Sequence, residues 1–187
     1  LVNNYLDMDG LVCISADHYG GAVQATEYLC KLGHCKIGLL SGRFSPQVSE
    51  ARIEGFVKTL AKYDIPVDDR FIADIEPALE DGEEIMTRML REVDRPTAFF
   101  CTNDTIAAGA MKAVTRAGLR VPEDIAIIGF DDSYISRVVE PELTTVRIDA
   151  AKMGCLAMQT LFDLIAGMPV EKAHIQIPTE LIVRGTA

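Results

Sequence analysis

Short apolar runs alternate along this chain with longer segments in which apolar residues return every three or four positions. The short runs are typical of strands buried on both faces of a sheet, and the longer segments are typical of helices with one buried face. The strands that this pattern predicts span residues 11–15, 36–41, 71–73, 97–102 and 124–129. Because a helical pattern separates each strand from the next, we expect right-handed βαβ crossovers. The predicted fold class is therefore α/β, with a parallel sheet flanked by helices on both faces.

Each of the four intervening helices is predicted from an apolar stripe. The stripes are Ala22, Ala25, Leu29 and Leu32; Ile53, Phe56, Val57 and Leu60; Met86, Met89, Leu90 and Val93; and Ala107, Ala110, Met111 and Val114. Gly33 and Gly118 predict the ends of the first and fourth helices. Ser45-Pro46 is a start signal for the second helix, and Asp17 is a candidate N-cap for the first.

The alternation of strands and helices changes after Asp132. The pattern predicts a loop or short helix at 133–141, an extended segment at 143–148, a helix ending at Gly167, and short strands at 173–177 and 180–184. The apolar stripe of that last helix consists of Met153, Ala157, Leu161 and Leu164. No repeat or low-complexity linker divides the chain, so its length predicts one domain, or one domain plus part of another.

Composition narrows the class of protein. Of the 187 residues, 49% are hydrophobic, which is enough for a sizeable core, and the formal net charge is -10. This acidic balance argues against these residues themselves gripping nucleic acid, which requires a basic surface. No apolar run approaches membrane-spanning length, so we expect no membrane partner. The chain does not begin with Met, and we interpret it as part of a longer protein.

The cysteines indicate a reducing compartment. Cys13, Cys30, Cys35, Cys101 and Cys155 are odd in number and lack the spacing of metal ligands. Each lies in or beside an apolar run, so we expect small buried hydrophobic residues rather than disulfide partners. Their use therefore predicts a cytoplasmic protein.

Polar residues occur where the predicted strands end. Asn103 follows the strand at 97–102, and the pair Asp131 and Asp132 follows the strand at 124–129. Because the carboxyl ends of strands in an open α/β sheet face the ligand crevice, we expect at least one of the two carboxylates there. Asn103 either caps the next helix or offers a donor and an acceptor to a ligand hydroxyl.

Arg52 is the fourth candidate, one residue before an apolar stripe. It is either a solvated arginine or a guanidinium fork that reaches over the crevice towards a ligand's oxygens. The sequence contains no phosphate-binding loop, nucleophile elbow, His-Glu-x-x-His or Cys-x-x-Cys motif. We therefore expect a binding protein and not an enzyme, with no cofactor and no metal.

Several longer motifs occur in a fixed order along the chain. They are Arg52-Ile53-Glu54-Gly55-Phe56, Thr102-Asn103-Asp104, Val121-Pro122-Glu123-Asp124-Ile125, Gly129-Phe130-Asp131-Asp132, Leu143-Thr144-Thr145-Val146-Arg147 and Pro178-Thr179-Glu180-Leu181. Each motif is weak alone, but their order and spacing are specific. With them, almost the whole chain resembles the LacI/GalR family of bacterial transcription repressors.

The resemblance implies a periplasmic-binding-protein-like (type I) fold, in which two lobes enclose a cleft for a sugar or similar small effector. It implies that residues 5–147 and about 175–187 form most of the C-terminal lobe, and that about 148–174 are a remnant of the N-terminal lobe. The helix-turn-helix domain is absent from this sequence. Operator DNA would therefore be bound only through that missing domain.

The resemblance also implies particular contacts. The family's effector contacts fall on Arg52, Asn103 and Asp131. Family members form homodimers, for which the helix at 105–117 and the segment 133–139 are the candidate surfaces. The effector would shift the balance between two arrangements of the lobes and so control operator binding. Glu76-Pro77 contains no aromatic ring, although some members place one there beneath a sugar, so the effector's identity stays open.

Two other functions share some of these features. A periplasmic sugar-binding receptor of a transport system has the same fold, with an export signal and no DNA-binding domain. An enzyme would use Asp131 and Asp132 as acid and base. The motifs at 121–125 and 143–147 favour the repressor over the receptor, and the absence of a nucleophile or cofactor loop argues against the enzyme.

Overall fold

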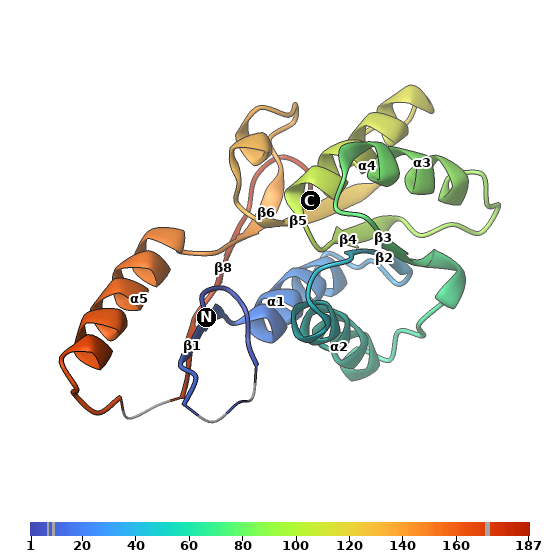
Figure 1. Ribbon diagram of the computed structural model, residues 1–187. Helices are drawn as coiled ribbons and strands as arrows, with labels where there is room; N and C mark the ends of the chain where they lie inside the picture. Colours follow the sequence, from blue (N-terminus) through green and yellow to red (C-terminus); the bar gives the residue numbers. More distant parts are fainter. Residues whose placement is uncertain (7, 9, 171–172) are drawn as a thin grey trace.

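The computed structural model describes residues 1–6, 8, 10–170 and 173–187, and a six-stranded sheet forms the main body of this part (Figure 1). Its strands, in order across the sheet, are β3 (Ile72–Ile75), β2 (Ile37–Gly42), β4 (Ala98–Cys101), β5 (Ala126–Asp131), β6 (Thr144–Arg147) and β8 (Glu180–Ile182). Neighbouring strands from β3 to β6 are parallel, and β8 runs antiparallel to β6.

Helices cover both faces of this sheet (Figure 1). The helices are α1 (His18–Lys31) and α2 (Pro46–Lys62) on one face, and α3 (Leu79–Met89) and α4 (Asp104–Arg116) on the other. Two short 3-10 helices, η1 (Asp69–Phe71) and η2 (Tyr134–Arg137), lie in the connections. The predicted parallel α/β sheet with helices on both faces is therefore confirmed.

Two apolar cores lie between the sheet and its helices. Phe99 and Ile127 pack into the core beneath α3 and α4, whereas Phe100 and Ile128 pack into the core beneath α1 and α2. Because neighbouring residues of β4 and β5 enter opposite cores, β4 and the part of β5 before Asp131 contain no polar side chain. This double covering explains the unbroken apolar runs in the sequence.

The helix boundaries follow the local signals. Gly33 and Gly118 have positive φ angles of 91° and 76° just after α1 and α4, a conformation that glycine adopts most readily. The Asp17 side chain accepts a hydrogen bond from the Gly20 N–H at 2.8 Å and so caps α1. The predicted end signals and the predicted N-cap are confirmed.

A second sheet of two strands lies beside the main body (Figure 1). β1 (Cys13–Ala16) pairs in parallel with β7 (His174–Ile177), and α5 (Ala150–Ile165) packs against them through Met153. The apolar pattern places the strand at 11–15 in the large parallel sheet, and this is wrong. An apolar run indicates a buried strand, but it does not say which other strand supplies the hydrogen bonds.

The chain therefore passes between the two sheets three times. The crossings lie at 16–18, 147–150 and 177–180. The boundaries expected near 5 and 175 are displaced to about 17 and 178, because β1 and β7 pair with each other and not with the main sheet.

The helix α5 projects from the body, and most of its apolar side chains are exposed (Figure 1). Of the predicted stripe, Met153 is buried, whereas Leu161 and Leu164 are about half exposed. Most of the stripe is uncovered because α5 contacts the described residues mainly through β1. Val93, which the pattern places in the stripe of the third helix, is exposed because α3 ends at Met89.

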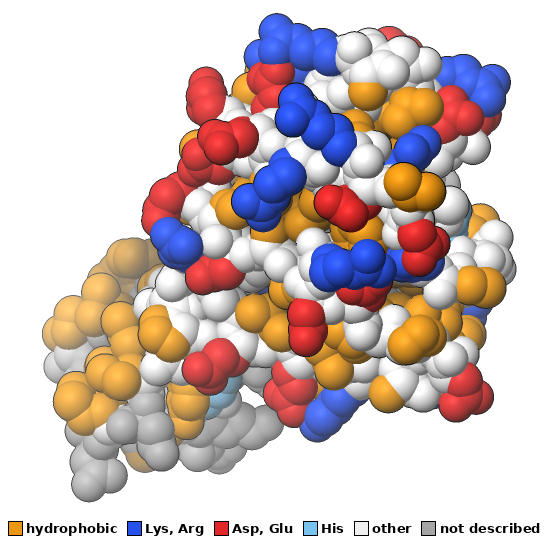
Figure 2. Space-filling model, turned by 90° about the vertical axis from the view of Figure 1, so that its right-hand side faces the viewer, with side chains coloured by type: hydrophobic (Ala, Val, Ile, Leu, Met, Phe, Trp, Pro, Cys, Tyr) orange, Lys and Arg blue, Asp and Glu red, His pale blue; other side chains and the backbone are white. Residues whose placement is uncertain are grey.

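The surface carries charges of both signs. On the face shown in Figure 2, acidic and basic side chains are interspersed over the main body. Cys13, Cys30 and Cys101 are buried as predicted, whereas the prediction is wrong for Cys35 and Cys155, which are exposed. Among the described residues, no helix combines the length and the apolar character needed to cross a membrane.

Candidate functional site

Side chains from three connections meet at the carboxyl end of the main sheet. Arg52 comes from α2, Asn103 from the connection between β4 and α4, and Asp131 from the end of β5. Arg52 Nη2 lies 3.4 Å from Asp131 Oδ1, and Asn103 Nδ2 donates to Asp131 Oδ2 at 3.2 Å. The structure thus brings together the three residues selected from the sequence, which we call the polar triad.

Arg52 is the buried member of the polar triad, with a side chain that is only 3% exposed. Its guanidinium carbon lies 3.9 Å from the centre of the Phe130 ring and 5.0 Å from that of Phe44, and Nη1 donates to the Thr102 carbonyl oxygen. Burial lowers the pKa of Arg52 to about 10, and the carboxylate of Asp131 opposes that shift. The guanidinium is therefore held charged and immobile, unlike a solvated arginine.

Asn103 is the N-cap of α4, which is one of the two roles predicted for it from the sequence. Its Oδ1 accepts hydrogen bonds from the N–H groups of Thr105 and Ile106 at 2.8 and 3.0 Å, and so caps α4. Its Nδ2 donates one hydrogen to Asp131, which leaves the second for another acceptor. The cap fixes the orientation of the amide towards the crevice.

Asp131 is the accessible member of the polar triad, with 31% of its side chain exposed. Its backbone has a φ of 108°, an unusual value for a residue with a side chain, at the point where β5 ends. Burial raises the pKa of Asp131 above its ordinary value, and Arg52 and Asn103 act in the opposite direction. Its carboxylate is the natural acceptor for a ligand's hydroxyl group.

Asp132 has a different environment, although it is adjacent in sequence. Its side chain is 2% exposed and forms ion pairs with Arg184 at 2.5 Å, Arg147 at 2.7 Å and Arg137 at 3.4 Å. Burial alone would raise the pKa of Asp132, but the hydrogen bonds from Arg184 and Arg147 lower it to about 2. Because the Asp132 side chain is buried and its oxygens are bound by three arginines, it is not free to exchange a proton as one half of an acid–base pair with Asp131.

Asp104 fixes the loop that follows β5. Its fully buried carboxylate accepts hydrogen bonds from the Ser133 N–H at 2.6 Å and from the Thr145 hydroxyl at 2.5 Å. Burial raises the pKa of Asp104 to about 6. Because Asp104 begins α4 directly after Asn103, these bonds hold the loop after Asp131 against the helix that carries the triad's amide.

His18 also contacts the polar triad and was not selected from the sequence. It begins α1 after the cap Asp17, and its Nδ1 lies 3.2 Å from Arg52 Nη2. His18 is the second residue after β1, as Asn103 is the second residue after β4, but nothing in the sequence indicates its contact with Arg52. The ring is buried, and burial together with the charge of Arg52 lowers the pKa of His18 to about 3.

The lowered pKa of His18 predicts acid sensitivity. An unfolded histidine has a pKa near 6.5, so neutral His18 contributes stability above that pH and the contribution is lost as the pH falls towards 3. Compared with His18→Asn, the unsubstituted protein should lose about 2 kcal/mol more free energy of unfolding between pH 7 and pH 5, measured with urea. The raised pKa of Asp104 acts in the opposite direction, but it cancels because both proteins contain Asp104. Equal pH dependence in the two proteins would contradict this burial.

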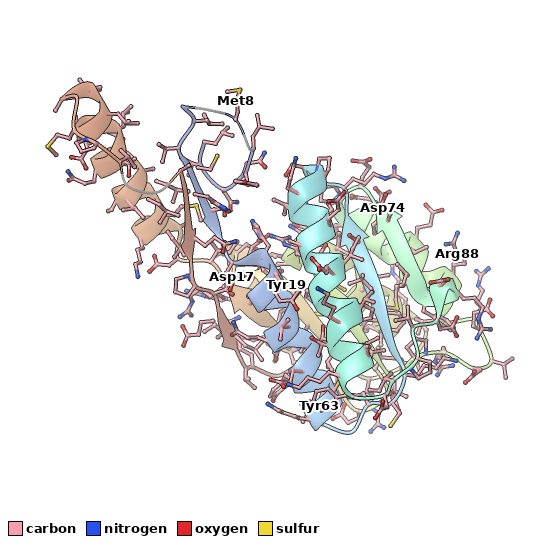
Figure 3. All side chains as sticks on the ribbon, turned by 90° about the horizontal axis from the view of Figure 1, so that it is seen from below. Met8, Asp17, Tyr19, Tyr63, Asp74 and Arg88 are labelled. Atoms are coloured by element: carbon pink, nitrogen blue, oxygen red, sulfur yellow. The ribbon has the colours of Figure 1, made fainter. Side chains whose placement is uncertain are left out.

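Two hollows flank this region. A cavity of about 260 Å³ is lined by His18 and Tyr19 at the start of α1, by Gln47 of α2, and by residues of β1 and β7. Figure 3 shows Tyr19 and Asp17 at the end of α1 nearest the small sheet, with Tyr63 at the opposite end of the main body.

A larger hollow of about 530 Å³ lies along the edge strand β3. Its walls include the exposed side chains of Arg43, Asp74 and Glu76, and Arg43 forms an ion pair with each of the two carboxylates. It shares no lining residue with the polar triad. The smaller cavity is therefore the one associated with the candidate site, because His18 lines it and contacts Arg52.

The fold and the crevice are those of a periplasmic-binding-protein-like lobe. Residues 26–187 match the family described as the periplasmic binding protein-like domain. The "HTH-type transcriptional repressor PurR" of Pasteurella multocida (strain Pm70) is 38% identical over 174 residues, which cover 91% of this chain and 52% of that repressor.

Solved structures agree. The crystal structure of a regulatory protein of the LacI family from Chloroflexus aggregans matches with a TM-score of 0.91 and 32% identity over 97% of this chain and 65% of that chain. The complex of the transcriptional regulator CelR with cellobiose matches with a TM-score of 0.89 and 27% identity over 95% of this chain and 54% of that chain. The chain belongs to the LacI/GalR family and contains its effector-binding core. It spans about half the length of the curated relatives it matches.

Proposed function

We propose that this chain is the ligand-sensing part of a LacI-type transcription regulator, and that the polar triad binds its effector. The convergence of Arg52, Asn103 and Asp131 at the carboxyl end of a parallel sheet supports this proposal. The three side chains come from three separate parts of the chain, whereas a purely structural ion pair would need only Arg52 and Asp131. Its relatives are repressors by name, which favours a regulator over a transport receptor.

The chemistry of the polar triad suits a sugar or a similar polyhydroxyl molecule. Asp131 offers accessible acceptor oxygens, and Asn103 has a free N–H beside them. A sugar hydroxyl donates and accepts at once, so neighbouring hydroxyls can satisfy both groups. The structural relative bound to cellobiose provides a precedent for a sugar in this family.

We assign the two sheets to two lobes. The main sheet with α1 to α4 is the C-terminal lobe, and β1, β7 and α5 are a remnant of the N-terminal lobe. The exposed apolar residues of α5 then mark where the rest of that lobe packs. Operator DNA is bound by a helix-turn-helix domain outside this chain, and the protein works in the cytoplasm. The effector changes the angle between the lobes and so the spacing of the DNA-binding domains.

Replacing Asp131 with alanine tests the assignment of the site. In the full-length protein, we expect effector binding to weaken by about 1.5–3 kcal/mol, the scale of a hydrogen bond to a charged group. A thermal-shift screen of glucose, galactose, cellobiose, adenine and guanine would identify a binding compound, and titration calorimetry would measure its affinity. The control is Asp74→Ala, which removes an exposed carboxylate from β3.

Two results would contradict the proposal. If none of these sugars or nucleobases stabilises the unsubstituted protein, the sensing function is not supported. If Asp131→Ala and Asp74→Ala bind the selected compound equally well, the polar triad is not the effector site.

We also propose that the protein is a homodimer formed through residues 133–139. Of the two candidate surfaces, α4 is largely buried inside its own lobe, whereas the 133–139 segment carries an exposed aromatic ring at Tyr134 and an exposed Val138. Such a patch is typical of a protein–protein contact.

Tyr134→Glu should therefore convert the dimer to a monomer, because a carboxylate would be desolvated in the contact. Sedimentation velocity of the full-length protein measures the change. Val93→Glu is the control, since Val93 is equally exposed but lies after α3, away from the segment. A monomeric unsubstituted protein, or a dimeric Tyr134→Glu variant, would contradict this surface.

A further inference from the structure

The tautomer of His18 follows from its contact with Arg52. The two side-chain nitrogens, Arg52 Nη2 and His18 Nδ1, are 3.2 Å apart. A guanidinium group only donates hydrogen bonds, so Nδ1 must be the acceptor. The ring hydrogen of neutral His18 is therefore on Nε2.

This Nε2–H group is a buried donor without an acceptor. Among the described residues, Nε2 has no hydrogen-bond partner, although His18 is only 5% exposed. An unsatisfied buried donor costs about 1–3 kcal/mol. The ring cannot avoid this cost by changing tautomer, because a hydrogen on Nδ1 would then point at the Arg52 guanidinium.

The surrounding groups leave this donor available. On the opposite wall of the 260 Å³ cavity, the ring of Tyr5 stacks on that of His174 at 4.2 Å, and Ser15 Oγ lies 2.8 Å from His174 Nε2. Ser15 Oγ and His174 Nε2 are thus paired with each other, between β1 and β7 of the small sheet. Gln47 and Tyr19, which line the cavity next to His18, are exposed side chains that can move to admit a ligand.

We propose that His18 is an effector-contacting residue, whose Nε2–H donates to an oxygen or nitrogen acceptor of the effector in this cavity. The proposal rests on the proposed function and extends the site from the polar triad towards the small sheet. The effector would present a hydroxyl donor to Asp131 and an uncharged acceptor, such as a ring or hydroxyl oxygen, to His18. His18 would thereby select compounds with an acceptor at that end.

Two substitutions separate the roles of the two ring nitrogens. In His18→Asn, the side-chain oxygen replaces Nδ1 as acceptor for Arg52, and the Nε2–H is lost. In His18→Gln, the amide nitrogen occupies the place of Nε2 and restores a donor. In full-length protein titrated with cellobiose, glucose, galactose, adenine and guanine, we expect His18→Asn to weaken binding of the recognised compound about tenfold. His18→Gln should bind more tightly than His18→Asn.

A second measurement uses only the unsubstituted protein, so its result does not depend on whether the variants fold. In the unsubstituted protein, the His18 Nε2–H signal in a nitrogen–hydrogen NMR spectrum should shift when the recognised compound is added. No shift, together with wild-type affinity in His18→Asn, would overturn the role of His18. If Asp131→Ala still weakens binding in that case, the proposed function stands and only this inference fails. If no compound in the panel binds the unsubstituted protein, both are overturned.

Discussion

Replacing Arg52 with alanine should lower the free energy of unfolding by about 3 kcal/mol, because it removes a buried cation from its partners. The change removes the Arg52 donor from Asp131 Oδ1 and from the Thr102 carbonyl oxygen, and it empties the space between Phe44 and Phe130. Urea unfolding measures this loss. Arg52 is thus expected to be the least replaceable member of the polar triad.

The same substitution should weaken effector binding by about 1.5–3 kcal/mol, measured by calorimetry in the full-length protein. Arg52→Lys distinguishes charge from geometry. A lysine keeps the charge but cannot donate to Thr102, His18 and Asp131 together, so it should restore stability only in part.

Arg43→Ala is the matched control, because Arg43 lies at the same end of the sheet. Its guanidinium is exposed and paired with Asp74 and Glu76, so its removal should lower the free energy of unfolding far less than Arg52→Ala does. If Arg52→Ala and Arg43→Ala lower the free energy of unfolding by similar amounts, the buried contacts of Arg52 do not stabilise the fold as proposed.

Replacing Asp132 with alanine should lower the free energy of unfolding by about 3 kcal/mol, because the buried Arg184 guanidinium loses its nearest carboxylate and keeps Glu142, 3.5 Å away. Arg137 and Arg147 can turn towards solvent, but the side chain of Arg184 is only 11% exposed. The ion pairs of Asp132 tie the end of β5 to Arg147 of β6 and to Arg184 beyond β8. Their loss should loosen the segment 133–139 as well.

Asp124→Ala provides the comparison. Asp124 pairs with Arg120 on the surface, so its removal should lower the free energy of unfolding far less than Asp132→Ala does. A double variant, Asp132→Ala with Arg184→Met, should recover part of the loss, because the buried charge is then removed as well. A loss below about 1 kcal/mol for Asp132→Ala alone would contradict the proposed network.

Much of the fold could be read from local patterns. The core strands β4 and β5 were recognisable because their residues before Asp131 form unbroken runs without polar side chains, as expected when both faces of a strand are covered. The helix ends at Gly33 and Gly118 were recognisable because left-handed backbone favours glycine. Asn103 and Asp131 were predictable because parallel strands end at one edge, whereas Arg52, which lies within α2, was indicated by the family resemblance.

Other features depend on contacts between distant residues. The different roles of Asp131 and Asp132 could not be predicted from their shared position after β5. Only the fold places Arg184 and Arg147 beside Asp132 and Arg52 beside Asp131. His18 was overlooked for the same reason, since its importance comes from its contact with a helix that begins 28 residues later in the chain.

The sequence alone determined the α/β class, the order of strands and helices, the family, and the three residues that meet at the crevice. These depend on periodicity, turn residues and short motifs, which act within a few neighbouring positions. Only the tertiary structure decided that β1 pairs with β7, that α5 leaves its apolar side uncovered, and that Asp132 is neutralised by arginines. Strand partners, helix burial and ion pairs are formed by residues far apart in the chain, and no local pattern specifies which of them will meet.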